Sequence, residues 1–257
     1  MAGILAARHV SKAFPGGRGA PLVAIEDLSF EVEEGELMCL LGASGCGKST
    51  ILNMFAGFVA PTSGEVTLRG RPIIGIEPRC GMVFQSYALF PWKTVRENIE
   101  FGPKMQGVGR AERHRRADRF IEKVNLTGFE DLYPTELSGG MQQRVTLARV
   151  LAADPEVLLM DEPFAALDAI TRDVMHDELT RVWKETGNSI VFVTHNVREA
   201  VRLGQRVVLL SSRPGRVVGE WKVNIRGPRT IEHPAVGAVA AEITLRLREE
   251  IASHARS

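Results

Sequence analysis

Apolar runs rich in branched residues alternate along this sequence with segments of helical period. Near its start, Leu28, Phe30 and Val32 alternate with polar residues, which is typical of a half-buried antiparallel strand. Later runs are short and continuously apolar, as expected for strands buried on both faces of a mainly parallel sheet. These runs are Leu37–Leu41, Val157–Met160 and Ile190–Val193. Because polar residues leading toward a helix follow each run, the pattern predicts an α/β fold with ligands at the carboxyl ends of the strands.

The stretch from about residue 86 to residue 155 has a helical pattern instead. Its segments of helical period, with no strand between them, are Thr94–Phe101, Ala111–Val124 and Ser138–Leu151. We interpret this stretch as a helical subdomain inserted into the α/β core of a single domain spanning residues 1–257. Near the end, an apolar stripe on a terminal helix is predicted from residues that recur every four positions, Ile243, Leu247 and Ile251.

Composition excludes several classes of protein. At 44% hydrophobic and 25% charged residues, the chain matches an ordinary globular protein rather than a disordered or collagen-like one. Its net charge of +1 gives no general reason to expect DNA or RNA as a partner, because Lys and Arg dominate affinity for phosphates.

The 3 cysteines lack the paired spacing of a zinc site and favour a reducing compartment. The longest charge-free stretch, Ser49–Gly64, is too interrupted to span a bilayer. We therefore expect membrane contact only through another chain.

Residues 42–49 carry the clearest chemical motif. They fit G-x-x-x-x-G-K-[ST] and lie between the predicted strand Leu37–Leu41 and a helical segment from Thr50. The glycines let backbone N–H groups wrap a phosphate, and the helix adds its positive N-terminal end. We expect Lys48 to reach the β- and γ-phosphates and the Ser49 hydroxyl to bind Mg²⁺. The residues predicted to bind a nucleoside triphosphate are Gly42, Ala43, Ser44, Gly45, Cys46, Gly47, Lys48, Ser49 and Thr50.

Two adjacent acids, Asp161 and Glu162, directly follow the apolar run Val157–Met160. By themselves, such acids indicate a solvated turn more often than a site. Here the buried strand before them and the phosphate loop earlier in the chain favour a catalytic interpretation. We expect Asp161 to hold Mg²⁺ and Glu162 to orient and deprotonate an attacking water.

A third motif, Ser138-Gly139-Gly140, directly precedes a helical run. Alone it indicates an N-capped helix that exposes N–H groups to an anion. Together with the two preceding motifs, it resembles the signature of the ABC transporter ATPase family, and the resemblance covers nearly the whole chain. The family resemblance implies an α/β P-loop core of the RecA-like kind, with an N-terminal antiparallel β portion and an inserted helical subdomain.

The resemblance implies roles for four further residues. Phe14 resembles the aromatic residue that stacks on adenine, although that residue is more often tyrosine in the family. Gln85, expected at the end of a strand Met82–Phe84, resembles the glutamine that joins the two subdomains and senses Mg²⁺ and the attacking water. Asp168 is expected at a dimer interface, and His195 is expected to contact the γ-phosphate. Asn196 stands after this histidine, where the family usually has Asp, but the histidine itself is retained.

The resemblance also implies that the chain works as a dimer. Ser138, Gly139 and Gly140 of one copy are expected to close over the ATP that Lys48 of another copy holds. Because the chain carries one set of motifs, two copies are expected to form a head-to-tail dimer with two ATP molecules between them.

The segment 86–92 is unusually apolar and contains Phe90 and Trp92. In the family, this segment receives a coupling helix from a membrane permease. The alternative is that both aromatic residues pack in the core of the subdomain. The resemblance thus implies a peripheral protein at the cytoplasmic face of the inner membrane, served indirectly by a substrate-binding protein.

Three short segments resemble the subgroup of importers for nitrate, taurine and aliphatic sulfonates. They are Phe90-Pro91-Trp92, Gly139-Gly140-Met141 and Ser212-Arg213-Pro214-Gly215-Arg216. Residues 211–257 are too few for the extra β-barrel domain of sugar-importer relatives, so we expect a short C-terminal extension without a regulatory domain. An exporter, a lipid transporter and a soluble cofactor-assembly ATPase remain alternative functions at this stage.

A basic cluster surrounds His114 in the predicted helix Ala111–Val124. Its members are Arg110, Arg113, Arg115, Arg116 and Arg119, interrupted by Glu112 and Asp118. A solvated helix face is the favoured interpretation. Contact with anionic lipid headgroups is the alternative.

Overall fold

The computed structural model of this chain describes residues 3–16, 21–225, 227 and 229–254. The chain divides into two compact units, the first made of residues 1–78 and 189–257 and the second of residues 79–188. Within the described residues, no helix combines the length and the apolar character needed to cross a membrane.

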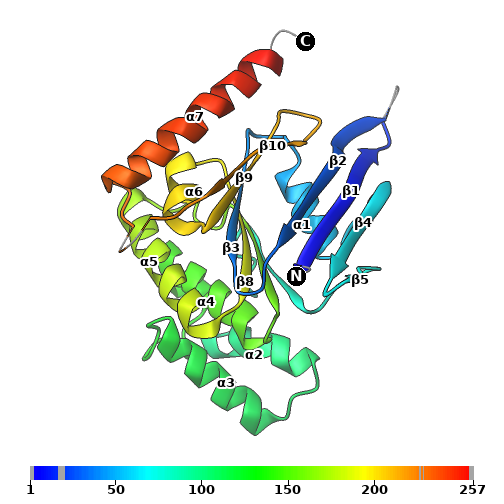
Figure 1. Cartoon of the computed structure of the whole chain (residues 1–257). Helices are drawn as coiled ribbons and strands as arrows, with labels where there is room; N and C mark the ends of the chain where they lie inside the picture. The colour runs from blue at the N-terminus through cyan, green and yellow to red at the C-terminus, as the bar shows by residue number, and fades with distance from the viewer. Residues whose placement is uncertain (1–2, 17–20, 226, 228, 255–257) are drawn as a thin grey trace. The chain divides into compact units, whose positions relative to one another are not determined.

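The first unit contains an antiparallel sheet and a group of mainly parallel strands (Figure 1). The antiparallel sheet has the order β2-β1-β4-β5, formed by β1 (Leu5–Phe14), β2 (Leu22–Val32), β4 (Ser63–Leu68) and β5 (Arg71–Pro72). The second group has the order β10-β9-β3-β8, formed by β3 (Leu37–Leu41), β8 (Ser189–Thr194), β9 (Arg206–Leu210) and β10 (Val217–Lys222). In it, β3 runs parallel to β8 and β9, as the apolar runs predict.

Burial explains why these short runs form strands. All five residues of β3 and all six of β8 are buried, which continuous apolar character favours in a parallel sheet. The helices of this unit are α1 (Lys48–Phe55), α6 (Val197–Leu203) and α7 (Pro234–His254), and α7 lies beside α6 (Figure 1). Of the predicted terminal stripe, Ile243 is buried but Ile251 is 47% exposed, so only the first half of α7 packs as predicted.

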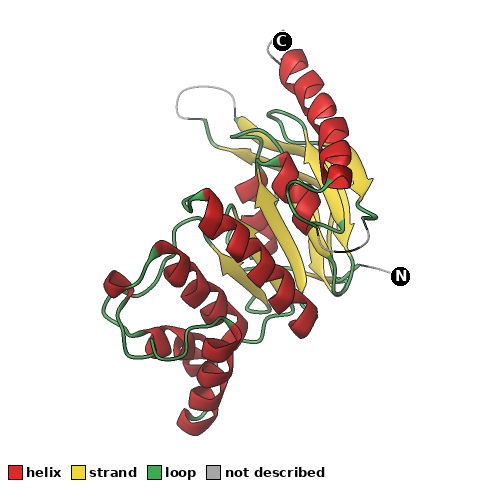
Figure 2. Cartoon of the chain, turned by 90° about the vertical axis from the view of Figure 1, so that its left-hand side faces the viewer, coloured by secondary structure: helices red, strands yellow, loops and turns green. Residues whose placement is uncertain are grey.

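The second unit is mostly helical (Figure 2). Its strands β6 (Cys80–Val83) and β7 (Val157–Asp161) pair in parallel. Its helices are α2 (Val95–Met105), α3 (Arg110–Lys123), the 3₁₀ turn η1 (Pro134–Glu136), α4 (Gly139–Ala152) and α5 (Ala169–Thr186). The three predicted helices are confirmed as α2, α3 and α4, and the stretch 86–155 lies inside this unit. The strand expected at Met82–Phe84 instead ends at Val83, and Phe84 is 38% exposed.

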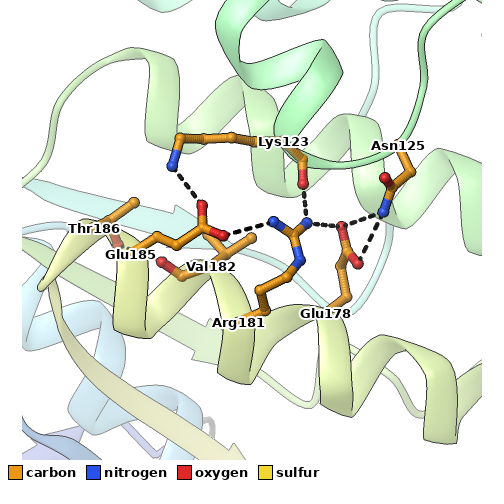
Figure 3. Close-up of polar contacts among 7 residues, drawn as sticks. All are labelled: Lys123, Asn125, Glu178, Arg181, Val182, Glu185 and Thr186. Carbon is orange, nitrogen blue, oxygen red and sulfur yellow. Dashed lines mark hydrogen bonds and ion pairs between the residues drawn. The ribbon is translucent and has the colours of Figure 1, made fainter.

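A polar network joins the end of α3 to α5 within the second unit (Figure 3). Arg181 on α5 donates hydrogen bonds to the Lys123 carbonyl, to Glu178 at 2.7 Å and to Glu185 at 2.9 Å. The Lys123 ammonium also donates to Glu185 at 2.6 Å. Asn125 donates its side-chain amide to both oxygens of Glu178, at 3.4 and 3.3 Å. The network therefore holds the last turn of α3 and the second residue after it against one face of α5.

Candidate functional site

The predicted phosphate loop connects β3 to α1. Gly47 is the N-cap of α1 with φ 102°, and a Cβ at this position would lie 2.3 Å from Cδ1 of Ile25, so glycine is required there. Lys48 is 6% exposed, and its ammonium donates to the carbonyl oxygens of Gly42 at 2.8 Å and Ala43 at 3.0 Å. The lysine is thus held inside the curve of its own loop, at the N-terminus of α1, where an anion is favoured.

His195 emerges beside this loop within the first unit. Strands β3 and β8 are parallel neighbours with Leu41 opposite Thr194, so the phosphate loop and His195 leave the sheet at the same edge. His195 is exposed. The side chain of Asn196 caps α6 by accepting from the backbone N–H groups of Arg198 and Glu199, which explains how Asn can stand where the family has Asp.

The remaining predicted site residues of the first unit are Phe14 and those in the first turn of α1. Phe14 is the last residue of β1 and is half-buried, with the Lys12 ammonium 5.1 Å from the centre of its ring. Ser49 is exposed and Thr50 is half-buried in the first turn of α1. The Ser49 hydroxyl is thus positioned at the helix N-terminus, as the motif predicts.

The second unit brings Gln85 and the two acids to one strand edge. Strands β6 and β7 are parallel with Val83 opposite Met160, so Gln85 and Asp161 both lie at the carboxyl ends of these strands. Glu162 has φ 44°, a left-handed conformation that residues with a Cβ rarely adopt. Such backbone strain costs on the order of 1–3 kcal/mol and gathers at functional sites. Six other non-glycine residues of the described chain share such a φ, so the catalytic role of Glu162 stays a prediction.

The predicted signature forms the start of α4. Ser138 is exposed and caps the helix, because its hydroxyl accepts from the N–H of Met141 at 3.3 Å. Gly139 and Gly140 are the first two residues of α4. A Cβ on Gly139 would lie 2.8 Å from the Tyr87 hydroxyl and 3.6 Å from Cδ2 of Leu167. The signature therefore packs closely against both the loop after Gln85 and the loop after Glu162.

Asp168 begins α5 as its N-cap. Its carboxylate accepts from the N–H of Thr171 at 3.0 Å, and the residue is exposed. Hydrogen bonds from the Thr171 hydroxyl and N–H lower the pKa of Asp168 from its usual value, which keeps the carboxylate ionised. The side chain thus both stabilises the helix start and remains at the surface.

The segment after Gln85 is held by residues that sequence reasoning missed. Asn98, fully buried on α2, accepts from the Phe90 N–H at 2.9 Å and donates to the carbonyls of Phe90, Lys93 and Thr94. The sequence did contain one signal for this role: Asn98 is a polar residue between apolar Val95 and Ile99 on the buried face of a predicted helix. A buried amide with this many backbone partners fixes the turn around Trp92.

Arg149 on α4 also holds the backbone of the segment after Gln85. It donates to the Ala88 carbonyl at 2.7 Å, and burial lowers the pKa of its guanidinium. Thr146 donates its hydroxyl to the Tyr87 carbonyl at 3.0 Å. The loop that follows Gln85 is therefore fastened to the helix that carries the signature.

The two aromatic residues of the predicted docking segment differ in their environment. The Phe90 ring packs 4.5 Å from the ring of Phe101 and 5.8 Å from that of Trp92, measured between centroids. Trp92 is 70% exposed. Phe90 is thus half-buried and packs on Phe101, whereas the Trp92 side chain is largely exposed on the second unit.

Acidic residues pair with much of the basic cluster on α3. Glu112 accepts from Arg115 at 2.5 Å and from Arg116 at 3.1 Å, and these bonds lower the pKa of Glu112. Glu100 lies 3.4 Å from Arg113 and 2.5 Å from His114. This pairing within the unit favours the solvated-face interpretation of the cluster.

Comparisons with known proteins agree with these observations. A family model described as ABC transporter matches residues 25–165. The taurine import ATP-binding protein TauB of Roseobacter denitrificans is 48% identical, over 85% of this chain and 82% of its own length. The nitrate import ATP-binding protein NrtD of Synechocystis is 49% identical, with 85% and 82% covered. A solved dimer of an ATP-binding cassette, bound to ADP and Pi after hydrolysis, is 32% identical with a TM-score of 0.73, covering 87% of this chain and 99% of its own. The predicted family and fold class are confirmed.

Proposed function

Since this chain belongs to the ABC transporter family, whose cassettes bind ATP, we propose that it is the ATP-hydrolysing subunit that energises an importer. The observation that carries this proposal is the phosphate loop. Its buried Lys48 lies at the N-terminus of α1, and His195 leaves the neighbouring strand at the same sheet edge. This combination of backbone N–H groups, a cation and a histidine suits a bound triphosphate.

Hydrolysis in this proposal is mainly positioning and charge neutralisation. Lys48 binds the β- and γ-phosphates, and His195 contacts the γ-phosphate. Glu162 orients the attacking water and accepts its proton, while Gln85 lies at the same strand edge as the acid. Phe14 stacks on the adenine at the end of β1.

The ion expected with ATP is Mg²⁺, and three oxygen-bearing side chains suit it. These are the hydroxyl of Ser49, the amide of Gln85 and the carboxylate of Asp161. Mg²⁺ is usually bound by one or two carboxylates together with substrate phosphates and water. The described residues contain no cluster of three or more His, Cys, Asp or Glu that could hold a metal by themselves. When bound, the ion neutralises charge on the β- and γ-phosphate oxygens.

The working form in this proposal is a head-to-tail dimer. Ser138, Gly139 and Gly140 of one copy close over the ATP held by Lys48 of the other, with Asp168 at the interface. Support comes from the exposure of Ser138 and Asp168 and from the dimeric state of the solved cassette. ATP closes the dimer and hydrolysis reopens it, because the γ-phosphate is contacted from both copies.

The partners are proposed to be permease subunits at the cytoplasmic face of the inner membrane, docking near Phe90 and Trp92. A substrate-binding protein acts indirectly by delivering cargo to them. The proposed cargo is taurine, nitrate or an aliphatic sulfonate, since relatives that are 48% and 49% identical are named for taurine and nitrate import.

Phosphate release by the purified chain tests the catalytic assignment. Glu162→Gln should lower hydrolysis by on the order of 10²–10³-fold while ATP binding is retained, because it removes the base without removing the phosphate loop. Glu156→Gln is the matched control, since Glu156 lies next to the opposite end of β7 and pairs with Arg79. Near-normal turnover of the Glu162 variant would show that another group is the base.

The cargo needs a separate experiment. The neighbouring genes are searched for a permease and a substrate-binding protein, and the chain is reconstituted in vesicles with those proteins. Stimulation of phosphate release by taurine, nitrate or an alkanesulfonate identifies the substrate. Failure of all three to stimulate a complex that still hydrolyses ATP would reject the proposed cargo but not the ATPase.

A further inference from the structure

The loop 211–216, Ser-Ser-Arg-Pro-Gly-Arg, lies between β9 and β10 and is closed on itself. The Ser211 N–H donates to the Arg216 carbonyl at 2.9 Å, and the Arg216 N–H donates to the Ser211 hydroxyl at 2.8 Å. The same hydroxyl donates to the Pro214 carbonyl at 2.8 Å. These bonds give the loop a defined shape that does not depend on its neighbours.

One side of this loop is attached to β2. The Gly215 N–H donates to the Ala24 carbonyl at 2.9 Å, and the Glu26 N–H donates to the Gly215 carbonyl at 3.1 Å. Farther out, the exposed Arg216 guanidinium pairs with Glu26 at 2.5 Å. The two backbone bonds anchor the loop to the antiparallel sheet.

The other side touches the phosphate loop, where the guanidinium of Arg213 donates from Nε to the Gly45 carbonyl at 3.2 Å. A Cβ on Gly45 would lie 3.2 Å from Nη2 of the same arginine. A Cβ on Gly215 would lie 2.2 Å from the Cys46 carbonyl oxygen. The loop therefore lies against two successive peptide groups of the phosphate loop, on the side of their carbonyls.

These contacts determine where the N–H groups point. The described peptide bonds in this region are trans except Arg213–Pro214, and in a trans peptide the C=O and N–H point in opposite directions. Holding the carbonyls of Gly45 and Cys46 toward the 211–216 loop directs the N–H groups of Cys46 and Gly47 away from it, and the Cys46 N–H donates to the Ala43 carbonyl of the phosphate loop at 3.3 Å. A charged donor on the Gly45 carbonyl also polarises that peptide and strengthens its N–H as a donor.

We propose that Arg213 is a positioning residue for nucleotide binding. Its guanidinium, held by the 211–216 loop, fixes the Gly45 carbonyl so that the backbone N–H groups of the phosphate loop face the phosphates. The inference rests on the proposed ATP site and adds to it a residue outside every predicted site motif. It also assigns a structural role to the Ser-Arg-Pro-Gly-Arg segment, in addition to its resemblance to a transporter subgroup.

The test measures ADP binding by titration calorimetry, together with KM for ATP, kcat and the melting temperature. Arg213→Met should raise the Kd for ADP by about 10-fold, equivalent to about 1.4 kcal/mol. It should raise KM in parallel and leave kcat at saturating ATP within about 2-fold, because it removes binding energy that the ground state and the transition state share equally. Arg213→Lys retains a charged donor and should restore most of the affinity.

Arg216→Met is the matched control, because it changes the same residue type in the same loop but loses only the exposed pair with Glu26. Its Kd for ADP should remain near that of the wild type. Gly215→Ala is an independent variant whose added Cβ displaces the neighbouring Cys46 carbonyl, and it should weaken ADP binding without removing any charge.

The inference is overturned if Arg213→Met binds ADP as tightly as the wild type, or if Arg216→Met weakens binding to the same extent. A drop in kcat with unchanged KM would also contradict it, since a positioning residue for binding acts on affinity. Failure of the wild type itself to bind ADP would overturn the proposed ATP site and this inference with it, so the two failures are distinguishable.

Discussion

Replacing Arg181 tests how firmly α3 is tied to α5 in the second unit. The arginine donates to the Lys123 carbonyl, to the buried carboxylate of Glu178 and to Glu185 (Figure 3). Arg181→Met keeps most of the aliphatic stem and removes all three bonds. We expect a lower free energy of unfolding, chiefly because the side chain of Glu178, a residue only 7% exposed, loses the guanidinium that it binds.

The magnitude follows from burial. Breaking a fully buried ion pair costs about 3–5 kcal/mol, but the Arg181 side chain is 39% exposed, so water replaces part of the interaction. We assign about one third of that range to the pair with Glu178, and about 0.5–1 kcal/mol to the hydrogen bond with the Lys123 carbonyl. The expected loss in the free energy of unfolding is about 2 kcal/mol. For a chain of this size, that corresponds to a melting temperature lower by about 4–8 °C.

Thermal and urea unfolding of Arg181→Met, Glu178→Gln and the double variant measure the effect and its coupling. We expect a coupling energy of about 1 kcal/mol between Arg181 and Glu178. Arg115→Met, which breaks an exposed pair on α3, is the control and should leave the transition unchanged. A coupling energy of zero, or equal effects at positions 181 and 115, would refute the reasoning.

Three further predictions concern the surface and the helix starts. Trp92→Ala should leave the melting temperature unchanged, because the side chain is 70% exposed, while weakening co-purification with the permease by about 10-fold; a loss of stability would indicate core packing instead. Thr94→Ala should cost about 1 kcal/mol by removing the capping box with Glu97, and Thr94→Ser should restore it in the same melting assay. Because its pKa is lowered in the folded chain, Asp168 stabilises the fold above its usual pKa of 3.8, and this contribution disappears as the pH falls through the lowered value. The difference in melting temperature between wild type and Asp168→Asn should therefore vanish in strong acid.

Much of the fold could be predicted because its strands and helices have consistent local patterns. The run Leu37–Leu41 is a strand with those bounds, and its complete burial explains its uninterrupted apolar character. The end of β6 was misplaced by one residue, since Phe84 is apolar but turns toward solvent, which periodicity does not reveal. The stripe on α7 was only half right for a similar reason, because an apolar residue such as Ile251 does not require a packing partner.

The site shows a different limit of sequence reasoning. Lys48 could be proposed from the phosphate-loop motif and Glu162 from an acid pair after a buried strand, and both roles stay predictions. Asn98, Arg149 and Arg213 were not predicted, because each acts through hydrogen bonds to backbone groups, and the partners of Arg149 and Arg213 are distant in sequence. Of the three, only Asn98 can be recognised in the sequence pattern, as a polar residue on an apolar helix face. Residues that support a site in this way become visible only when the backbone they hold is known.

The hydrogen bonds of Lys48 explain why the phosphate loop needs support from outside. Its ammonium already binds the carbonyls of Gly42 and Ala43, so contact with a phosphate exchanges these neutral acceptors for charged ones. The net gain is the difference between the two sets of bonds, and the loop loses internal bonds when Lys48 turns to the nucleotide. The contacts of Arg213 and Gly215 with Gly45 and Cys46 do not involve the lysine. They can therefore keep the N–H groups in place while Lys48 changes partner, which links the 211–216 loop directly to nucleotide affinity.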